Sequence, residues 1–264
     1  MRPILRITAP FTAAFLILLS TRLVSTNPLP VPVPQAQPAP APCAAITVIS
    51  ARGTTEDPGE GRLTTIASDL ANAHENSERI ALDYPAYLFP YSVSLFRGIQ
   101  ALTGLLNTSV SSCPTTKVVL LGYSQGAHVI GNTLCGGAFA EQGIDQRIGN
   151  KVAAIIFMAD PRHVPGKSFN VGSSTKSGYP SVASSPKFEP MYKITLKLHL
   201  SCQLFPRPES ENCDVYASRM RSYCDSGDPV CDSGFEQEVH RAVVEKYRAD
   251  AVAFVNRLLF CIVP

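Results

Sequence analysis

Short apolar runs and amphipathic stretches alternate along most of this chain of 264 residues. The runs at 45–51, 118–123 and 152–158 are rich in β-branched residues and contain few polar interruptions. Such runs are typical of strands that are covered on both faces, as in a parallel sheet. Weaker runs at 79–83 and 218–223 predict a short strand and an edge strand.

Between the runs, apolar residues recur every three or four positions, which is the pattern of one helix face. This pattern predicts helices that include 63–70, 93–106, 125–134 and 240–259. Strands that alternate with helices of this length predict an α/β fold with a doubly wound parallel sheet of about five strands flanked by helices. In open sheets of this kind, the functional site lies at the carboxyl ends of the strands.

Two segments before the first predicted strand differ from this pattern. Residues 1–25 carry arginines, then a short apolar run, then small residues, which is the order of a secretory signal peptide; a retained N-terminal anchor is the alternative. Residues 26–42 are rich in proline, which removes backbone donors and favours polyproline II, so they predict a linker or propeptide. The folded domain is therefore expected to span 43–264.

A third segment, 173–205, is rich in serine and proline and then runs through mixed apolar and basic residues. It has no place in an alternation of strands and helices. Because long unstructured loops are uncommon inside compact domains, this segment predicts either a lid or an error in the assignment of elements.

The composition narrows the class of protein. The net charge is +2 without a cluster of basic residues, so nucleic acid is not an expected partner. No run beyond residue 25 is long enough to cross a bilayer, so no membrane partner is expected. With the predicted signal peptide removed, the protein is expected to be soluble and secreted, and a secreted protein of this size is expected to be a monomer. Eight cysteines predict disulfides, and the lack of Cys-x-x-Cys and His-Glu-x-x-His spacings predicts no metal and no cofactor. Asn107 begins an N-glycosylation sequon in a predicted surface loop.

A Gly-x-Ser-x-Gly sequence at 122–126 follows a buried run and precedes a predicted helix. Its glycines allow the helix to cross close to the strand, so Ser124 can occupy a strained turn with its hydroxyl pointing out of the sheet. This is the position of a nucleophile. The alternative is that Ser124 only caps a helix that begins at Gln125.

A serine hydroxyl needs an imidazole to accept its proton and a carboxylate to orient that imidazole. His240 opens the last predicted helix and follows the serine and aspartate candidates, which is the chain order of α/β-hydrolases. His128 lies one turn into the helix after the serine and is expected to face away from the hydroxyl. Ordinary surface or loop positions are expected for the remaining histidines, His74, His163 and His199.

The carboxylate is expected in the loop between Cys224 and Cys231, because a disulfide between these cysteines would fix its direction. Asp228 is central in this loop and is preferred to Asp225, the second candidate. The alternative is that both are surface acids in a tight turn.

The oxyanion of a tetrahedral intermediate needs several hydrogen-bond donors. In this topology one donor is the backbone N–H after the nucleophile, here that of Gln125. The other comes from the loop after an early strand, here Thr54. The alternative for Thr54 is a turn residue that caps the next helix.

Three stretches and one histidine resemble the fungal cutinase and acetylxylan esterase family of secreted serine esterases. They are 51–56 (Ala-Arg-Gly-Thr-Thr-Glu), 122–127 (Gly-Tyr-Ser-Gln-Gly-Ala), 222–231 and then His240. The resemblance covers 43–256, apart from the segment without a place in the pattern. It implies a small, lidless α/β-hydrolase.

The resemblance also implies a role for each candidate residue. Ser124 is the nucleophile, Asp228 the orienting acid and His240 the base, while Thr54 and Gln125 match the family's oxyanion-hole positions. The implied disulfides pair Cys43 with Cys113, Cys135 with Cys213, Cys224 with Cys231 and, by elimination, Cys202 with Cys261. At about 179–203 family members run through a much shorter loop, so this stretch is either a genuine insertion near the site or translated intron in a mistaken gene model.

Motifs at 83–86 and 157–162 are closer to the acetylxylan esterase branch than to the plant-cutin hydrolases. The leading expectation is a secreted serine carboxylic-ester hydrolase that acts through an acyl-enzyme and deacetylates xylan. The alternatives are a cutinase that hydrolyses longer-chain polyester and a catalytically silent, secreted wall-binding or effector protein. The expected partner is an acetylated polysaccharide or polyester substrate.

Overall fold

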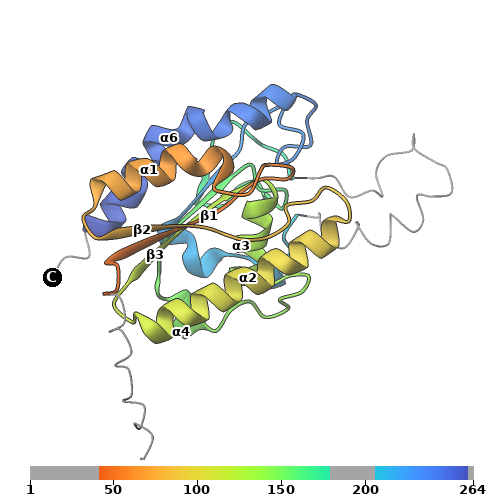
Figure 1. Cartoon of the computed structure of the whole chain (residues 1–264). Coiled ribbons are helices and arrows are strands. Elements are labelled where there is room, and N and C mark those ends of the chain that lie inside the picture. Colours follow the sequence, from red (N-terminus) through yellow and green to blue (C-terminus); the bar gives the residue numbers. More distant parts are fainter. Residues whose placement is uncertain (1–41, 179–205, 261–264) are drawn as a thin grey trace, which may run out of the picture. The chain divides into compact units, whose positions relative to one another are not determined.

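Parallel strands form the centre of the structure, a computed structural model that describes residues 42–178 and 206–260. The described residues contain one six-stranded sheet with the order β2-β1-β3-β4-β6-β5, and every pairing is parallel (Figure 1). The strands are β1 (Ile46–Ala51), β2 (Ser77–Ala81), β3 (Lys117–Tyr123), β4 (Val152–Met158), β5 (Asn170–Val171) and β6 (Met220–Tyr223). The predicted α/β fold with a doubly wound parallel sheet is confirmed.

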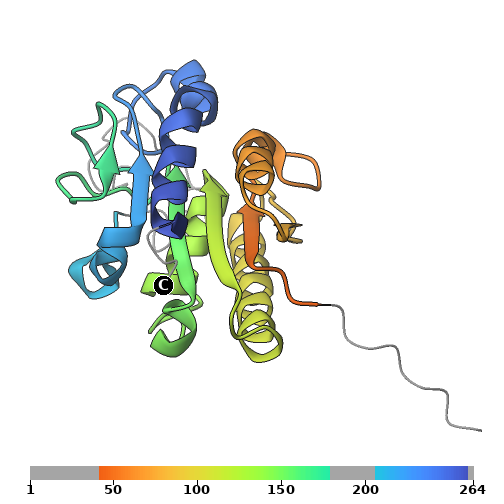
Figure 2. The ribbon, with the colours of Figure 1, turned by 90° about the vertical axis from the view of Figure 1, so that its left-hand side faces the viewer.

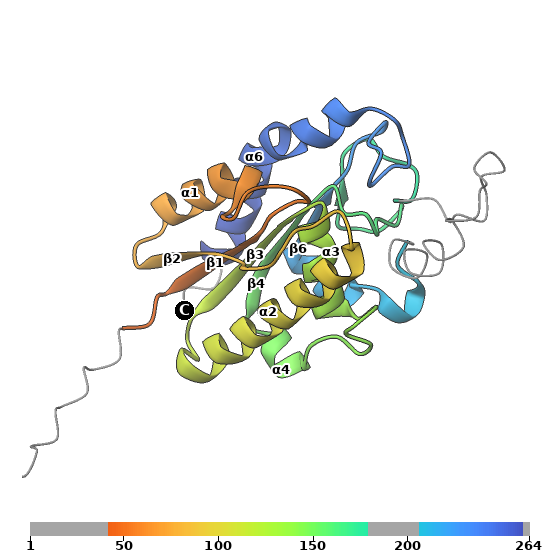
Figure 3. The same cartoon turned by 45° about the vertical axis from the view of Figure 1, so that its right-hand side comes forward.

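Helices cover both faces of this sheet. They are η1 (Gly61–Leu63), α1 (Thr64–Ala73), α2 (Tyr91–Ser112), α3 (Gln125–Cys135), α4 (Gln146–Gly149), η3 (Glu209–Glu211), η4 (Asp214–Arg219) and α6 (Gln237–Phe260). α1 and α6 lie on one face, and α2, α3 and α4 lie on the other (Figure 3). Within 42–178 and 206–260, no helix is both long and apolar enough to cross a membrane.

The central strand β3 sends alternate side chains to the two faces. Val118 and Leu120 pack into the core under α2 and α3, whereas Val119 and Leu121 pack into the core under α1 and α6. Because both faces are covered, the strand is a continuous apolar run in the sequence. The strand arrows in Figure 2 point toward one end of the sheet, where the loops after β3 and β6 lie. That end therefore positions the candidate residues.

Several details of the sheet differ from the prediction. The described residues form six strands where about five were expected, because the sequence pattern missed β5, which at two residues is too short to show any alternation. β6 is not an edge strand, since it lies between β4 and β5 and Ser222 pairs with Asn170. Strand β2 also begins at Ser77 and not at 79.

The prediction that Asn107 lies in a loop is also wrong. The polar residues after 106 suggest the end of a helix, yet α2 continues to Ser112. Asn107 is exposed on this helix, and its Nδ2 donates a hydrogen bond to Thr103 O over 2.8 Å. The sequon is therefore accessible, but on a helix surface.

Residues 173–178 are part of the fold, although their composition groups them with the segment that follows. In this stretch Ser174 Oγ donates a hydrogen bond to Asp232 Oδ1 over 2.6 Å. The predicted insertion or intron at about 179–203 lies outside the described residues. The same holds for His199, for the rest of the predicted lid, for the signal peptide and for 26–41 of the linker.

The described residues contain three disulfides, and they are the pairs that the family resemblance implies. They are Cys43–Cys113, Cys135–Cys213 and Cys224–Cys231. The first two close loops of 70 and 78 residues. Each of these two disulfides restricts the unfolded chain, and by the loop-entropy account this stabilises the fold by about 4 kcal/mol. Cys202 and Cys261 lie outside the described residues.

Candidate active site

Ser124 occupies the turn between β3 and α3 in an unusual backbone conformation. Its φ of 52° and ψ of −116° lie outside the regions that non-glycine residues commonly adopt. Its Oγ lies 3.1 Å from His240 Nε2 and does not cap α3. A sharp, strained turn that presents a serine at the end of a buried strand is the arrangement of a nucleophile elbow.

Two glycines beside Ser124 let α3 pass close to the strands. A Cβ atom at Gly126 would lie 1.8 Å from Ala51 O, and one at Gly122 would lie 2.7 Å from Ala127 Cα. Both positions therefore exclude any side chain unless the backbone moves.

We expect Gly126→Ala to destabilise the fold strongly. The clash with Ala51 O forces a backbone shift, and overpacking of this kind costs about 1–3 kcal/mol or more of the free energy of unfolding. Gly104→Ala in α2 is the matched control, because a Cβ there meets open space and alanine favours the helix by about 0.5–1 kcal/mol. Denaturant unfolding of both variants measures the difference. A Gly126→Ala protein as stable as the parent would show that α3 does not approach β1 this closely.

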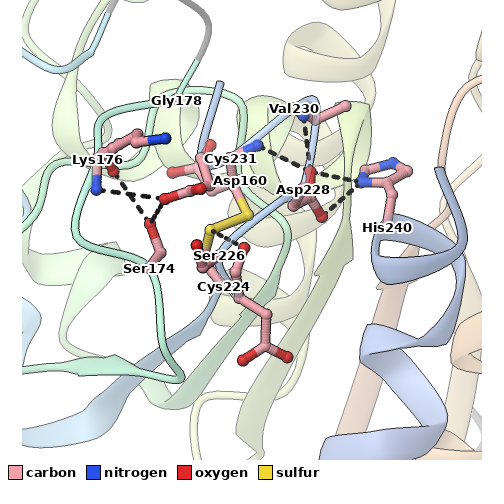
Figure 4. The surroundings of a disulfide bond; sticks show 12 residues. Asp160, Ser174, Lys176, Gly178, Cys224, Ser226, Asp228, Val230, Cys231 and His240 are labelled. Carbon is pink, nitrogen blue, oxygen red and sulfur yellow. Dashed lines mark hydrogen bonds and ion pairs between the residues drawn. A yellow bond between two sulfur atoms is a disulfide. The ribbon is translucent and has the colours of Figure 1, made fainter. Parts of the chain in front are cut away.

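Ser124, His240 and Asp228 form a chain of hydrogen-bonding groups although they are far apart in the sequence. His240 Nε2 lies 3.1 Å from Ser124 Oγ, and His240 Nδ1 lies 3.0 Å from Asp228 Oδ2. Figure 4 shows the Asp228 carboxylate facing the His240 ring. All three residues are buried. The arrangement is that of a nucleophile, a general base and an orienting acid.

The acid loop, residues 224–231, holds the Asp228 carboxylate in place. The Cys224–Cys231 disulfide closes the loop (Figure 4). The backbone N–H groups of Val230 and Cys231 donate to Asp228 Oδ1 over 2.7 and 3.0 Å. Because these donors satisfy a carboxylate that solvent does not reach, its direction toward His240 is fixed before any reaction.

Asp225, the second candidate for the acid, makes its contacts elsewhere. Its carboxylate accepts hydrogen bonds from Lys246 Nζ (2.6 Å), Tyr247 Oη (2.8 Å) and Ser173 Oγ (3.0 Å). Burial raises the pKa of Asp225, but these three partners outweigh burial, so the pKa lies below its ordinary value. Asp225 therefore anchors the acid loop to α6 and to the loop after β5.

Asp232, which the sequence analysis missed, anchors the other end of the acid loop. It is fully buried and accepts hydrogen bonds from Ser174 Oγ (2.6 Å), Gly227 N (2.9 Å) and Lys176 N (3.3 Å). Figure 4 shows Ser174 and Lys176 beside the loop. Burial raises the pKa of Asp232, yet the hydrogen bonds prevail and lower it.

Acid should weaken this anchoring. The pKa values of Asp225 and Asp232 are lower in the folded chain than in the unfolded chain. Their contribution to stability is therefore complete above the unfolded value of about 4 and is lost as the pH falls through the folded values. We expect the melting temperature to fall between about pH 5 and about pH 2, and Asp232→Asn to make this fall shallower. Thermal unfolding at several pH values measures both; the parent's pH dependence in the variant would refute the anchoring.

His128 is buried behind the cleft, and its Nδ1 lies 3.0 Å from Tyr91 Oη. Burial lowers the pKa of His128 far below its ordinary value, and the positive charges of Arg162 and Arg207 lower it further. The ring is therefore neutral near pH 7, and it contacts Tyr91 and not the hydroxyl of Ser124.

His163 lies in the loop after β4, as expected, but it is not on the surface. Its side chain is 3% exposed, and burial lowers its pKa. Sequence pattern cannot reveal this burial, because it results from packing against segments distant in the chain. His74 is half-buried, and its Nε2 lies 2.8 Å from Asn256 Oδ1.

Thr54 and Gln125 both lie beside Ser124. Thr54 belongs to the 52–57 loop, which follows β1, and lines the same cleft as Ser124. Gln125 is the first residue of α3, so its backbone N–H has no acceptor within the helix. A backbone N–H at a helix N-terminus is a suitable donor for a developing oxyanion.

Arg52 holds the 52–57 loop in place. Its Nε donates to Glu56 O over 2.9 Å, and its Nη2 donates to Tyr84 O over 2.6 Å. Glu56 Oε2 accepts a hydrogen bond from Gly53 N over 2.6 Å. Arg52 is only 3% exposed, so this loop is fixed by a buried cation that the sequence analysis did not single out.

The side chain of Gln125 is also fixed. Its Nε2 donates to Tyr87 O over 3.0 Å, and its Oε1 accepts from Ser94 Oγ over 2.8 Å. Ser94 Oγ in turn accepts from Tyr87 N over 3.0 Å. The sequence analysis missed this network, and its only available signal was a serine on the apolar stripe of α2.

The site opens into a cleft of about 560 Å³ that contains Ser124 and His240. Part of the lining is apolar and includes Leu88 and Tyr91, whereas another part is charged and includes Arg62 and Arg241. Beside it lies a hollow of about 1090 Å³ that shares Thr55, Glu56 and Leu88 with the cleft. The hollow is larger, but the hydrogen-bonded Ser124 and His240 line the cleft and not the hollow.

The serine lies on the turn after the central strand of a parallel sheet, and an aspartate and a histidine later in the chain complete a hydrogen-bonded chain with it. This arrangement is that of a serine-type α/β-hydrolase. The sequence profile of the cutinase family matches residues 42–259. The chain therefore belongs to the cutinase family.

Individual relatives agree with this assignment. The chain is 33% identical to the acetylxylan esterase of Hypocrea jecorina over 231 residues, covering 82% of this chain and 68% of that protein. It is 31% identical to cutinase 11 of Verticillium dahliae over 231 residues, covering 82% of this chain and 70% of that protein. The solved catalytic core domain of acetyl xylan esterase from Trichoderma reesei superposes with a TM-score of 0.69 at 32% identity, covering 82% of this chain and all of that one. The family resemblance is confirmed, and the protein is a serine carboxylic-ester hydrolase.

Proposed function

We propose that Ser124, His240 and Asp228 are the catalytic triad of this esterase. Ser124 Oγ attacks the ester carbonyl while His240 Nε2 accepts its proton. Asp228 accepts a hydrogen bond from His240 Nδ1 and so holds the imidazole in the required tautomer. The backbone N–H groups of Gln125 and Thr54 donate to the oxyanion of the tetrahedral intermediate. The observation that carries this proposal is the hydrogen-bonded chain from Ser124 through His240 to the buried Asp228.

Collapse of the intermediate completes the first half of the reaction. His240 donates its proton to the leaving alcohol oxygen, and the acyl group stays on Ser124. Water then enters, His240 accepts one of its protons, and the second intermediate releases the carboxylic acid and restores the serine hydroxyl.

We propose that the substrate is acetylated xylan. Two relatives that match over 82% of this chain are named acetylxylan esterases. The charged lining of the cleft also suits the polar alcohol part of a polysaccharide ester better than an apolar polyester. The neighbouring hollow shares part of this lining and leaves room for a polymer to extend. A cutinase that acts on longer-chain polyester is the second candidate, favoured by the likeness to cutinase 11 and by the exposed Leu88 and Phe89 beside the cleft.

Two measurements distinguish an acetylxylan esterase from a cutinase: hydrolysis of p-nitrophenyl esters from acetate to palmitate, and acetate release from acetylated xylan. Activity confined to acetate and butyrate, with acetate released from xylan, is the expected result. A maximum at longer chains would favour the cutinase. A disulfide-bonded protein that hydrolyses none of the esters would overturn the esterase proposal and favour the silent wall-binding protein.

We propose further that the protein is secreted as a monomer, with 1–25 removed, 26–42 as a linker or propeptide and 43–264 as the catalytic domain. The three disulfides of the described residues support an oxidising destination. N-terminal sequencing of protein from the culture medium, with its mass before and after glycosidase treatment, tests the cleavage and the glycan at Asn107. An intact N-terminus in the cell fraction would contradict secretion.

A further inference from the structure

Two arginines stand close together on the wall of the catalytic cleft. Arg62 comes from η1 and Arg241 from the first turns of α6, and both line the cleft that contains Ser124 and His240. Arg62 Nη1 donates a hydrogen bond to Arg241 O over 3.5 Å, which keeps the two residues adjacent. Their side chains are 46% and 56% exposed, so a substrate in the cleft can reach both of them.

The acidic partners of these arginines leave both able to bind another carboxylate. Glu56 lies 3.7 Å from Arg62 Nε, but its oxygens already accept from the backbone N–H groups of Gly53 and Arg62. Glu238 lies 2.8 Å from Arg241 Nη1 and is 84% exposed, so this surface ion pair is weak and readily exchanged. Asp228 faces His240 and is fully buried. The N-terminus of α6 adds partial positive charge to the same wall.

The position of Arg241 places the positive charge of the two arginines beside the alcohol part of the substrate. It follows His240 directly on α6, and Gln237 one turn earlier lines the cleft as well. In the proposed reaction, His240 protonates the leaving alcohol oxygen. The alcohol part of the ester is therefore the part that passes along the wall formed by α6.

We propose that Arg62 and Arg241 form a subsite for a carboxylate on the alcohol part of the substrate. The fitting ligand is a polysaccharide that carries uronic acid groups near the acetyl ester. Guanidinium groups bind carboxylates through paired, charge-assisted hydrogen bonds, and two of them on one wall discriminate an acidic sugar from a neutral one. This subsite rests on the proposed function and narrows it from xylan in general to uronate-bearing xylan.

Calorimetric titration with two xylo-oligosaccharides of equal length, one neutral and one carrying a uronic acid, tests the subsite without any need for turnover. We expect the acidic oligosaccharide to bind about five- to tenfold more tightly at low salt, and added salt to reduce this preference. The double variant Arg62→Gln/Arg241→Gln should bind both equally, and Arg62→Lys/Arg241→Lys should keep part of the preference. Arg147→Gln, which removes an arginine that is 91% exposed and outside the cleft lining, is the matched control and should keep all of it.

Hydrolysis of acetylated glucuronoxylan and of its carboxyl-reduced form, matched in acetyl content, gives the same comparison in turnover. A higher kcat/KM on the acidic polymer, lost in the glutamine double variant, is expected. Equal binding of the two oligosaccharides by the parent protein, or a preference that survives in the double variant, would overturn the subsite. Acetate release from neither polymer would overturn the proposed function, while the titration would still decide on the subsite.

Discussion

Ser124→Ala should reduce kcat on p-nitrophenyl acetate by about 10⁴-fold or more, since loss of a triad nucleophile leaves only binding and oxyanion stabilisation. The variant should fold normally, because the hydroxyl does not cap α3 and its contact with His240 Nε2 is not needed to form the turn. Alanine also has to adopt the same positive φ as the serine, so the strain of the elbow is shared by both proteins. The change therefore isolates chemistry from stability.

Kinetics and unfolding measured on the same preparations give the control for Ser124→Ala. The denaturation midpoint should match that of the parent. A variant that retains more than about a tenth of the parent's kcat, far above the residual rate expected after loss of a nucleophile, would assign the chemistry to another group.

Asp228→Asn should have the second largest effect, with kcat lower by about 10³–10⁴-fold. Asp228 accepts from His240 Nδ1, so its negative charge stabilises the ring when that ring becomes protonated. An asparagine keeps the size and can still accept from the N–H groups of Val230 and Cys231. It cannot supply the charge, and its amide can present a donor to Nδ1 and favour the wrong tautomer.

Asp225→Asn is the matched control for this variant. Asp225 lies in the same loop, but its partners are Lys246, Tyr247 and Ser173. This change should lower the free energy of unfolding, because it weakens these contacts. It should leave kcat within about tenfold of the parent, because the Asp225 carboxylate bonds to these residues and not to His240. Equal losses of kcat in both variants would mean that the acid loop as a whole, and not the Asp228 carboxylate, supports the reaction.

The parts of the fold that could be predicted are those whose signal is local. Strands buried on both faces give continuous apolar runs, so 45–51, 118–123 and 152–158 indicated β1, β3 and β4 to within a residue or so. The glycines of the elbow were informative for the same reason, since a Cβ would lie 1.8 Å from Ala51 O at Gly126 and 2.7 Å from Ala127 Cα at Gly122. Strand β5 has no such signal in its two residues.

The site was harder to predict where it depends on contacts between distant segments. Chain order and motif resemblance pointed to Ser124, Asp228 and His240, but the serine and histidine are separated by 116 residues and only the fold brings them together. The residues that support them were missed. Asp232 and Arg52 are ordinary charged residues in the sequence, and their roles arise from backbone groups of other loops.

The central claim is that Ser124 carries the acyl group, and covalent labelling tests it most directly. An alkyl p-nitrophenyl phosphonate transfers its phosphonyl group to an activated serine oxygen and releases p-nitrophenolate, so the product has a defined added mass. Peptide mass mapping after complete inactivation should find one adduct per chain, on the peptide that contains Ser124, and none on the Ser124→Ala protein. An adduct on a different residue, or full activity in protein labelled at Ser124, would contradict the account.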